Sequence, residues 1–356
     1  MRILITGNMG YVGPSVVSQL RRSYPTAYIV GVDAGFFSGC MIHQDFLPEL
    51  RLNQQLFADV RRLPENVLQG VDTVVHLAGI SNDPIGNLYE KVTMEINHGA
   101  TISLAEKAKA AGVRSFVFAS SCSVYGSAQE ADRTEDSEIN PLTAYARSKA
   151  QSEKDLRPLS SNDFTVTCLR FATACGISER LRLDLVLNDF VAGAVASREI
   201  SVLSDGSPWR PLINVKDMAR AFDWAVSRKP ASGGDFLTVN VGGTHGNYQV
   251  KELAEAVARI VPGVRVKINE HAAPDKRSYR VNFKRYSELA PQYQPINNLD
   301  SSISELKEGL ENLNFNDGNF RLSHFMRLVQ LNHLREIGYL SENLEWNSHI
   351  FSSLDQ

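Results

Sequence analysis

A tyrosine and a lysine lie four residues apart in the segment Tyr145-Ala-Arg-Ser-Lys149. On a helix, this spacing places both side chains on the same face. A tyrosine is a poor base at neutral pH because its pKa is about 10, but a nearby ammonium group or another positive charge stabilises the phenolate and lowers that pKa. The pair therefore predicts a base that removes a proton from a hydroxyl group. Alone, such a pair is usually a solvated helix face, so its interpretation depends on the surrounding motifs.

A run of small polar side chains spans residues 120–126, with the sequence Ser-Ser-Cys-Ser-Val-Tyr-Gly, and follows an apolar strand candidate. A hydroxyl group of this run can orient the oxygen atom of a substrate. Doubly wound sheets bind ligands at the carboxyl ends of their strands, where this run is expected. The serines therefore favour a catalytic function for the tyrosine and lysine over a solvated face.

Three glycines, Gly7, Gly10 and Gly13, lie between an apolar strand candidate and a helix candidate. The spacing suits a tight turn, a close approach of the backbone to a pyrophosphate group, and packing of the helix on the strand. The phosphates would lie at the positive end of the helix dipole. Spaced glycines alone often mark only a turn, but this context predicts a dinucleotide site. The predicted site includes the intervening residues Met9, Tyr11 and Val12.

Two acidic residues end apolar segments in the first sixty residues. Asp33 ends the segment VGVD, about twenty residues after the glycines, where a carboxylate accepts hydrogen bonds from the adenosine ribose and repels a 2′-phosphate. NAD is therefore predicted over NADP, with a helix or turn cap as the alternative role of Asp33. Asp59 and Val60 follow the segment QQLFA, and Asp59 is a candidate to contact the adenine amino group.

The elements that must position these residues alternate along the first half of the chain. Strands that are apolar throughout and separated by helices predict a parallel sheet covered on both faces. The right-handed crossover rule then favours a doubly wound Rossmann sheet. The strand candidates are Arg2–Thr6, Tyr28–Asp33, Thr73–Leu77, Ser115–Ser120 and Thr165–Phe171, and the helix candidates include Pro14–Ser23 and Val92–Ala111.

The pattern changes after Cys175, and the second half predicts a smaller, mixed α/β C-terminal lobe that binds the substrate. Phe236–Val241 is expected to join the main sheet, with the helix Val215–Ser227 packed beneath it. The other helix candidates are Arg182–Ser197, Gln249–Val261, Ser301–Leu313 and Leu322–Ile337, and the short strand candidates are Ile200–Leu203 and Val264–Ile268.

These elements divide the chain into three expected parts. Residues 1–175 form the NAD-binding Rossmann domain, which also receives segments near 212–242. Residues 176–211 and 243–315 form the substrate-binding lobe. Residues 316–356 form a helical C-terminal extension with no assignable role.

Composition excludes several other classes of protein. The 356 residues are 43% hydrophobic and 22% charged, and a formal net charge of −3 provides no global positive field for nucleic acid. The eight scattered histidines and four cysteines show no metal-binding spacing, so no metal is expected. The N-terminus begins directly with a strand and a glycine turn, and no apolar stretch has membrane-spanning length. A cytoplasmic protein without membrane contact is expected.

These motifs together resemble the extended short-chain dehydrogenase/reductase family, and within it the nucleotide-sugar epimerases and dehydratases such as the UDP-glucose/galactose 4-epimerases. The resemblance extends from Met1 to about Asn282 and includes segments 76–79 (HLAG) and 209–217 (WRPLINVKD). It implies that Tyr145 is the base, that Lys149 tunes it and binds the nicotinamide ribose, and that Ser121 completes the catalytic set. Further cofactor-binding residues implied by the resemblance are Leu77, Ala78, Gly79, Asn97 and Phe171.

The resemblance also implies a nucleotide-diphosphate sugar as substrate. Arg210 matches an arginine that binds the diphosphate, where a guanidinium group pairs well with phosphate oxygens, and the alternative is a surface arginine. Asn188 matches a second residue that contacts the diphosphate, and Arg277 resembles another cationic position. The remaining substrate-binding candidates are Ser81, Ser123 and Thr173, of which Thr173 replaces an asparagine common in the family.

Two departures from the family pattern narrow the reaction. The 4,6-dehydratases carry an Asp-Glu pair where this chain has Cys122 and Ser123, so dehydration is disfavoured. The GDP-mannose 3,5-epimerases place a catalytic cysteine two residues before the tyrosine of the VYG element, a place that Ser123 occupies here. Cys122 lies one residue earlier, which directs its side chain to the other face of an extended segment, so packing is favoured over catalysis.

The resemblance therefore predicts an NAD-dependent nucleotide-sugar epimerase that works by transient hydride transfer through a keto-sugar intermediate. The alternatives are an NAD(P)-dependent nucleotide-4-keto-sugar reductase or a 4,6-dehydratase in deoxysugar biosynthesis, and a non-catalytic dinucleotide-binding sensor. A homodimer through the helices Val92–Ala111 and Ala144–Leu156 is expected by resemblance, although their apolar stripes can equally pack against the sheet.

Overall fold

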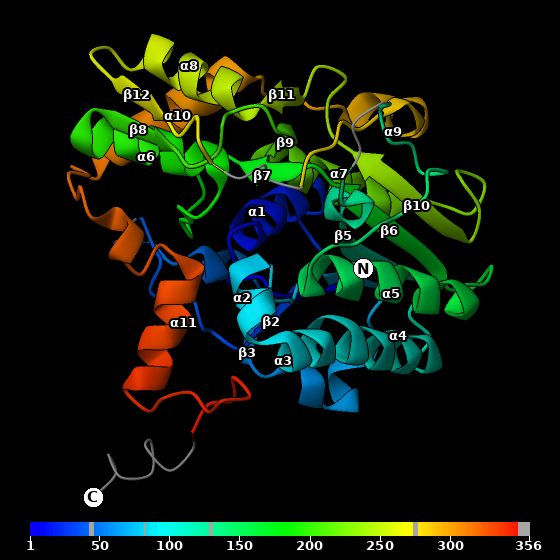
Figure 1. Cartoon of the computed structure of the whole chain (residues 1–356). Coiled ribbons are helices and arrows are strands. Elements are labelled where there is room, and N and C mark those ends of the chain that lie inside the picture. Colours follow the sequence, from blue (N-terminus) through cyan, green and yellow to red (C-terminus); the bar gives the residue numbers. More distant parts are fainter. Residues whose placement is uncertain (43–45, 82, 128–130, 273–276, 348–356) are drawn as a thin grey trace, which may run out of the picture.

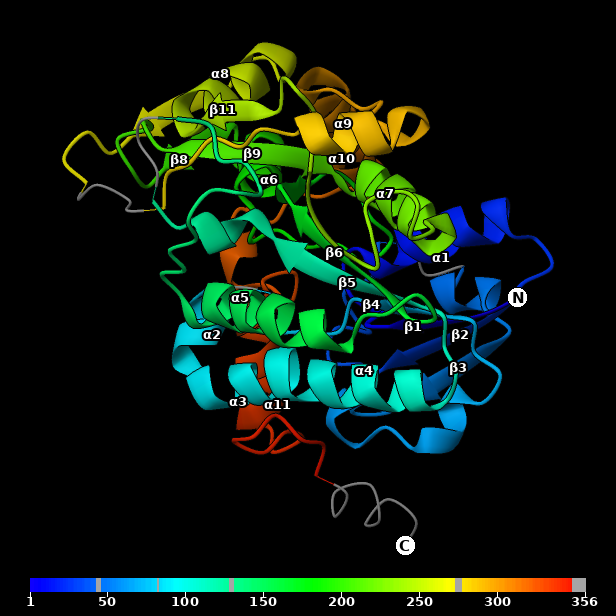
Figure 2. The same cartoon turned by 90° about the vertical axis from the view of Figure 1, so that its right-hand side faces the viewer.

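The computed structural model describes residues 1–42, 46–81, 83–127, 131–272 and 277–347 (Figure 1). A large parallel sheet with helices on both faces lies below a smaller lobe of helices and short strands (Figures 1 and 2). Residues 348–356 of the expected helical extension lie outside the described residues.

Seven parallel strands form the main sheet, in the order β10-β6-β5-β4-β1-β2-β3. This arrangement confirms the doubly wound Rossmann sheet. The chain leaves β1 toward β2 on one side and returns to β4 on the other, which creates the crevice where such sheets bind ligands. The strands are β1 (Arg2–Thr6), β2 (Tyr28–Asp33), β3 (Gln54–Phe57), β4 (Thr73–His76), β5 (Ser115–Ser121), β6 (Thr165–Phe171) and β10 (Phe236–Val241).

Helices cover both faces of this sheet. Helices α1 (Gly13–Ser23) and α7 (Val215–Ser227) pack together on one face, as expected for the Val215 helix, while α4 (Ala100–Ala110) and α5 (Ala144–Leu156) cover the other (Figure 2). The strands are buried on both faces, which explains why they read as continuous apolar runs.

The expected helix Val92–Ala111 consists of three consecutive pieces: α3 (Glu90–Met94), a π-helical turn η4 (Glu95–Gly99), and α4. Such turns insert one extra residue into the helical hydrogen-bonding pattern, and they occur often at functional sites. A further short helix, α2 (Asp83–Leu88), precedes them.

The smaller lobe is built around helices α6 (Val186–Ser197), α8 (Val250–Ile260) and α10 (Leu299–Asn312), which share one apolar core. Two small sheets accompany them. The first has the order β11-β9-β7, formed by Asn247–Gln249, Trp209–Asn214 and Thr173–Cys175, and the second pairs β12 (Arg265–Ile268) with β8 (Glu199–Val202). Helix α9 (Lys284–Leu289) lies beside β10.

The prediction of a helix from Arg182 was wrong over its first four residues, since α6 begins at Val186. The backbone before it pairs with distant segments instead. The amide of Leu181 donates to the carbonyl oxygen of Cys40 at 2.8 Å, and that of Leu183 donates to the carbonyl oxygen of Phe325 at 3.1 Å. These long-range bonds hold the segment out of the helical conformation.

The C-terminal extension contains the short turn η8 (Phe320–Leu322) and helix α11 (Arg327–Glu336), so the expected helix Leu322–Ile337 begins later than predicted. Helix α11 lies beside α2 (Figure 1). The other short turns are η1 (Pro48–Arg51), η2 (Val60–Arg62), η3 (Glu65–Leu68), η5 (Cys122–Tyr125), η6 (Arg157–Leu159) and η7 (Pro291–Tyr293). Within the described ranges, no helix has the length and apolar character needed to span a membrane.

Candidate active site

A cavity of about 870 Å³ lies at the carboxyl ends of the main-sheet strands, where the smaller lobe covers them. Most of the residues predicted from the sequence line this cavity. They are Gly7, Gly10, Tyr11, Val12, Asp33, Asp59, Val60, Leu77, Ala78, Gly79, Ser81, Ser121, Ser123, Tyr145, Lys149, Phe171, Thr173, Arg210 and Arg277. Four predicted residues, Met9, Gly13, Asn97 and Asn188, lie outside its lining.

The glycine turn between β1 and α1 forms one wall. Gly7 has a φ of +77°, and a Cβ atom there would lie 2.5 Å from the backbone nitrogen of Ala78. Gly13 packs so closely on the preceding turn that a Cβ atom would collide with the carbonyl oxygen of Asn8. The turn therefore presents bare backbone and the N-terminus of α1 to the cavity, a setting that fits the pyrophosphate group of a dinucleotide.

Asp33 marks the adenosine end of this wall. Its carboxylate accepts hydrogen bonds from the backbone amide of Met9 at 2.9 Å and from that of Gly35 at 2.7 Å. Burial raises the pKa of Asp33, and these two amide hydrogen bonds oppose that shift. Because Asp33 also lines the cavity, its remaining lone pairs fit the hydroxyl groups of an adenosine ribose.

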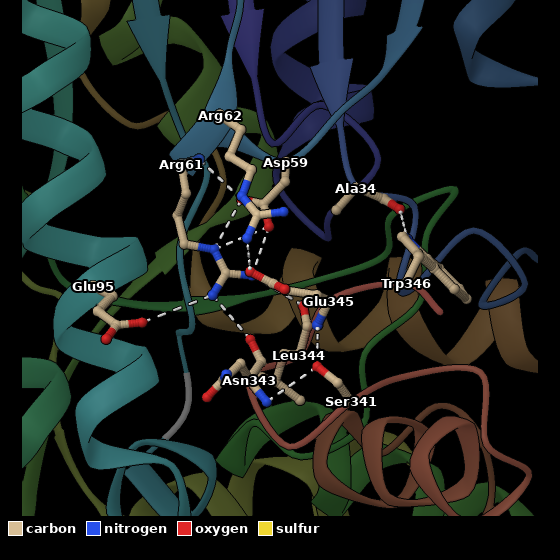
Figure 3. Close-up of polar contacts among 10 residues, drawn as sticks. All are labelled: Ala34, Asp59, Arg61, Arg62, Glu95, Ser341, Asn343, Leu344, Glu345 and Trp346. Atoms are coloured by element: carbon tan, nitrogen blue, oxygen red, sulfur yellow. Dashed lines mark hydrogen bonds and ion pairs between the residues drawn. The ribbon is translucent and has the colours of Figure 1, made fainter. Parts of the chain in front are cut away.

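Asp59, the predicted adenine contact, lies at the same end and is tightly bound by a neighbour (Figure 3). The guanidinium group of Arg61 donates from Nε to both carboxylate oxygens of Asp59, at 3.0 and 2.9 Å. The same guanidinium group donates to the carbonyl oxygens of Asn343 and Leu344, in the C-terminal extension. Asp59 therefore joins the adenosine end of the cavity to the C-terminal extension.

The predicted catalytic residues converge on the opposite end of the cavity. Thr143 caps α5 by accepting a hydrogen bond from the amide of Ala146 at 3.2 Å, and this places Tyr145 and Lys149 on the helix face that borders the cavity. The hydroxyl of Ser121, at the end of β5, lies near enough to the phenol of Tyr145 to influence its ionisation. The Lys149 ammonium nitrogen lies 5.7 Å from the Tyr145 ring centroid.

Burial shifts both titrating groups of this set toward their uncharged forms. It raises the pKa of Tyr145 to about 12, although the neighbouring hydroxyl of Ser121 acts in the opposite direction. It lowers the pKa of Lys149 to about 8, partly offset by the negative charge of Glu153. A group that adds positive charge next to the phenol would lower the pKa of Tyr145 again.

Asn97 supports this set from beneath the cavity. Its side chain is fully buried, accepts a hydrogen bond from the amide of Ile80 at 2.7 Å, and donates to the carbonyl oxygen of Ile80 at 2.8 Å and to Ser148 at 3.0 Å. A Cβ atom on Gly79 would lie 3.0 Å from the Asn97 carbonyl oxygen and 3.6 Å from the Lys149 ammonium nitrogen. Asn97 therefore fixes the turn after β4 against α5.

A buried ion pair lies behind the catalytic helix. Arg170 on β6 donates to both carboxylate oxygens of Glu153, and Glu153 also accepts a hydrogen bond from Ser120 at 2.5 Å. The other arm of Arg170 donates to the Tyr125 hydroxyl at 2.9 Å. This network joins strands β5 and β6 to α5.

Two predicted cations, Arg210 and Arg277, meet in the wall formed by the smaller lobe. Arg210 donates to the carbonyl oxygens of Trp209, at 2.9 Å, and Arg277. The guanidinium group of Arg277 pairs with Asp83 at 2.9 Å, and Asp83 also accepts a hydrogen bond from Thr143 at 2.7 Å. This wall thus combines two guanidinium groups with one carboxylate close to the start of α5.

Asn188 is not brought into the cavity. Its side chain is fully buried in α6, where it accepts a hydrogen bond from the amide of Gly176 at 3.0 Å and donates to the carbonyl oxygen of Arg182 at 2.8 Å. In this structure it positions the segment between β7 and α6, and its side-chain amide also donates to the hydroxyl group of the cavity-lining Tyr11 at 3.2 Å.

Three cavity-lining arginines were missed by the sequence analysis. Arg182 is buried, donates to Ser81 at 2.9 Å and pairs with Asp184 at 2.6 Å. The alternating arginines of the segment SERLRLD were an available signal of an extended, two-sided segment, but they were interpreted as part of a helix. Arg321 and Arg327 come from the C-terminal extension, and no local motif marks them.

Cys122 and Ser123 lie in the short turn η5, which replaces the expected extended segment, and their side chains have different surroundings. Cys122 is fully buried outside the cavity lining, and its thiol donates to the carbonyl oxygen of Arg170 at 3.1 Å. Burial raises the pKa of this thiol far above its usual value. Ser123 lines the cavity, and its hydroxyl has no hydrogen-bond partner among the described residues.

A model of the NAD dependent epimerase/dehydratase family matches residues 3–242. The UDP-glucose 4-epimerase of Streptomyces lividans is 27% identical over 283 residues, which are 73% of this chain and 80% of the relative. UDP-arabinose 4-epimerase 1 of Arabidopsis thaliana is 26% identical over 301 residues, which are 75% of this chain and 68% of the relative.

Solved structures share the fold at lower sequence identity. MoeE5 in complex with UDP-glucose and NAD is 24% identical with a TM-score of 0.75, covering 88% of this chain and 99% of that chain. UDP-glucuronic acid 4-epimerase from Bacillus cereus, in complex with UDP-glucuronic acid and NAD, is 21% identical with a TM-score of 0.75, covering 88% of this chain and 100% of that chain.

Proposed function

The chain belongs to the NAD-dependent epimerase/dehydratase family, and from this premise we propose that it is a nucleotide-sugar epimerase that works through a transient keto sugar. One observation carries the proposal: Ser121, Tyr145 and Lys149 line the same cavity as the glycine turn and Asp33. The proposed base Tyr145, the cation Lys149 that stabilises its phenolate, and the hydroxyl donor Ser121 thus border the proposed dinucleotide site.

The residues present fit NAD. The glycine turn and the N-terminus of α1 would hold the pyrophosphate, Asp33 the adenosine ribose, and Lys149 the nicotinamide ribose. NAD supplies a hydride acceptor that can return the hydride to the same carbon. The carboxylate of Asp33 disfavours a 2′-phosphate at the adenosine ribose, which supports NAD over NADP.

Tyr145 is the residue that moves the proton. Its phenolate removes the proton of a sugar hydroxyl while the hydride leaves the same carbon, so that a carbonyl group forms. The Lys149 ammonium group stabilises the phenolate, and Ser121 donates a hydrogen bond to the sugar oxygen. When the keto sugar turns and takes the hydride back on its other face, Tyr145 returns the proton, and the product is an epimer without net oxidation.

The surroundings of β5 support epimerisation over loss of water. A dehydration needs an acid to protonate the departing hydroxyl group, and residues 122 and 123 provide a thiol and a hydroxyl group instead of carboxyl groups. The Cys122 thiol is directed away from the cavity, toward the carbonyl oxygen of Arg170. Of these two residues only Ser123 lines the cavity, and its hydroxyl group is a much weaker acid than a carboxyl group.

A nucleotide-diphosphate sugar is the proposed substrate. Arg210 and Arg277 lie in the wall of the smaller lobe, where guanidinium groups can bind diphosphate oxygens bidentately. Thr173 and Ser81 line the same cavity and add hydroxyl groups. The curated relatives that act on UDP-sugars make UDP the first nucleotide to test.

The experiment incubates the purified protein in heavy water with UDP-, dTDP-, GDP- and CDP-sugars, without added NADH, and follows the products by NMR and mass. The expected product is an isomer of unchanged mass, inverted at one carbon. Loss of water would identify a dehydratase, and deuterium gained beside a ketone would identify proton exchange at a neighbouring carbon. Turnover of only a 4-keto sugar with NADH or NADPH would identify a reductase. Each of the last three outcomes would contradict the proposal.

We propose two further properties, an oligomeric state and a cellular location. Helices α4 and α5 lie side by side on one outer face (Figure 2), and we propose that this face forms a homodimer, which sedimentation analysis would test. A cytoplasmic location is proposed because the four cysteines are buried free thiols, as expected in a reducing compartment. Fractionation of the producing cells would test it.

A further inference from the structure

The C-terminal extension follows the part of the chain that matches the family, and it packs on the cofactor end of the cavity (Figure 1). Its buried leucines share a core with residues of the turn after β4 and of helices α2 and α3. These leucines are Leu331, Leu334, Leu340 and Leu344, and their partners include Ile80, Ile85 and Val92. The extension is therefore a fixed part of the fold next to the cavity.

Residues of the segment 341–346 of the extension also make polar contacts beside Asp59 and Ala34 (Figure 3). The indole nitrogen of Trp346 donates to the carbonyl oxygen of Ala34 at 2.6 Å, directly after Asp33. On the other side, Arg61 donates to the carbonyl oxygens of Asn343 and Leu344, at 2.9 and 3.2 Å. Arg61 also donates to the carboxylate of Asp59. The extension is therefore linked to Asp33 through Ala34 and to Asp59 through Arg61.

Arg327, at the start of α11, is the cation that the extension brings to the cavity. Its side chain is 3% exposed and lines the cavity, and it lies over the Phe37 ring at 4.4 Å from the centroid. Within the described part of the chain, neither Nη1 nor Nη2 has a hydrogen-bond partner. The neighbouring Cys40 thiol donates its hydrogen to the carbonyl oxygen of His324 at 3.2 Å.

Two buried guanidinium nitrogens without a hydrogen-bond partner are costly, so Nη1 and Nη2 of Arg327 indicate a missing anion. The other buried arginine nearby, Arg182, is already paired with Asp184. Arg327 also lies close enough to Tyr11, in the glycine turn, for its charge to affect that phenol. Its neighbours Phe37 and Tyr11 both belong to the cofactor half of the cavity, while Arg210 and Arg277 belong to the wall of the smaller lobe.

We propose that the C-terminal extension is part of the cofactor site, and that Arg327 binds the pyrophosphate of NAD. With the extension closed over the adenosine, the cofactor is retained between turnovers, as a reaction that returns its hydride requires. This inference rests on the proposed NAD-dependent function.

The test measures the dissociation constants of NAD and of UDP, together with the melting temperature without nucleotide, for the full chain and Arg327→Met. The substitution keeps the length of the side chain and removes its charge. We expect NAD to bind about ten- to hundredfold more weakly, since a charge-assisted hydrogen bond is lost. UDP affinity should stay within about twofold, and the melting temperature should not fall, because an unpaired buried charge has been removed.

Arg335→Met is the matched control. Arg335 lies on the same helix α11 and also lies over an aromatic ring, but it is outside the cavity lining and donates to the Tyr89 hydroxyl at 2.5 Å. NAD affinity of this variant should stay within about twofold of that of the original protein, because the removed charge does not border the cavity.

Three results would overturn the inference. Unchanged NAD affinity in Arg327→Met would remove Arg327 from the cofactor site, and a loss confined to UDP would assign it to the substrate diphosphate. A lower melting temperature with equal loss of both ligands would show a structural role. The unsubstituted protein separates a failure of this inference from a failure of the proposed function. If it binds NAD normally, only the role of Arg327 is in question, and if it binds no NAD, the proposed function fails too.

Discussion

The side-chain amide of Asn97 donates a hydrogen bond to the hydroxyl group of Ser148 at 3.0 Å, and this bond joins the π-helical turn η4 to the catalytic helix α5. Ser148 immediately precedes Lys149 and donates to the carbonyl oxygen of Tyr145 at 2.7 Å. Through Ile80, the same amide also holds the turn after β4 that borders the cavity. Asn97 therefore sets the distance between the cofactor wall and the proposed base without touching the cavity itself.

Replacing Asn97 with alanine should lower the free energy of unfolding by about 1–3 kcal/mol, because the backbone groups of Ile80 lose their buried partners. Denaturant unfolding of the nucleotide-free protein measures this loss. Glu106→Ala, on the exposed side of α4, should leave the value within about 0.5 kcal/mol. Equal stabilities of the two variants would show that Asn97 does not hold the turn.

Tyr145→Phe should remove the proton transfer while keeping the ring in place. The turnover number should fall by about 10²–10⁴-fold, the usual contribution of a positioned acid–base group. NAD affinity should change little, because the cofactor wall consists mainly of the glycine turn and Asp33. Steady-state kinetics and a separate NAD titration check the two parts. Turnover that survives the substitution would exclude Tyr145 as the base, and a sensor protein would show no turnover before or after it.

The sequence predicted the main sheet well because its strands are buried on both faces and read as uninterrupted apolar runs. Strands β1, β2, β6 and β10 have the predicted bounds. The four-residue spacing of Tyr145 and Lys149 likewise predicted that they share a helix face, because that pattern is local. Strand β3, at the edge of the sheet, was not predicted as a strand, since only Leu56 and Phe57 in it are apolar.

The missed features depend on partners far along the chain. The segment before α6 is extended because it pairs with Cys40 and Phe325, which no local pattern reveals. Likewise, Arg327 reaches the cavity only because α11 packs on α2, more than two hundred residues away in the sequence. The burial of Asn188 has the same origin, since its side-chain amide donates to the hydroxyl group of Tyr11, 177 residues away in the sequence.

Asp33→Ser should change the choice of cofactor. The carboxylate is lost as an acceptor of ribose hydrogen bonds and as a negative charge, so NAD affinity should fall by about ten- to hundredfold while NADP binds better than before. Titration of both cofactors measures the change in their ratio. Met9 and Gly35 also lose a shared acceptor, so the melting temperature is needed as a control. An unchanged ratio of NAD to NADP affinity would show that Asp33 only caps the turn.

The pKa of Lys149 predicts how the activity depends on pH. Burial lowers this pKa from its usual value to about 8, so the ammonium group is present below that pH and is lost as the pH rises through it. Because the ammonium group stabilises the Tyr145 phenolate, kcat/KM should fall on the alkaline side near pH 8. Lys149→Arg keeps a positive charge at every accessible pH, so its alkaline fall should disappear even if its activity is lower.

Glu153 offers an independent check of the same assignment. Its carboxylate raises the pKa of Lys149, so Glu153→Gln should move the alkaline fall of kcat/KM to lower pH. The substitution also breaks the buried pair with Arg170, which should cost about 3–5 kcal/mol of stability, so the profile must be measured below the melting temperature of the variant. A purely structural role of Glu153 would reduce activity equally at every pH. If the midpoint of the alkaline fall of kcat/KM is unchanged in Glu153→Gln, the ionisation of Lys149 does not cause that fall.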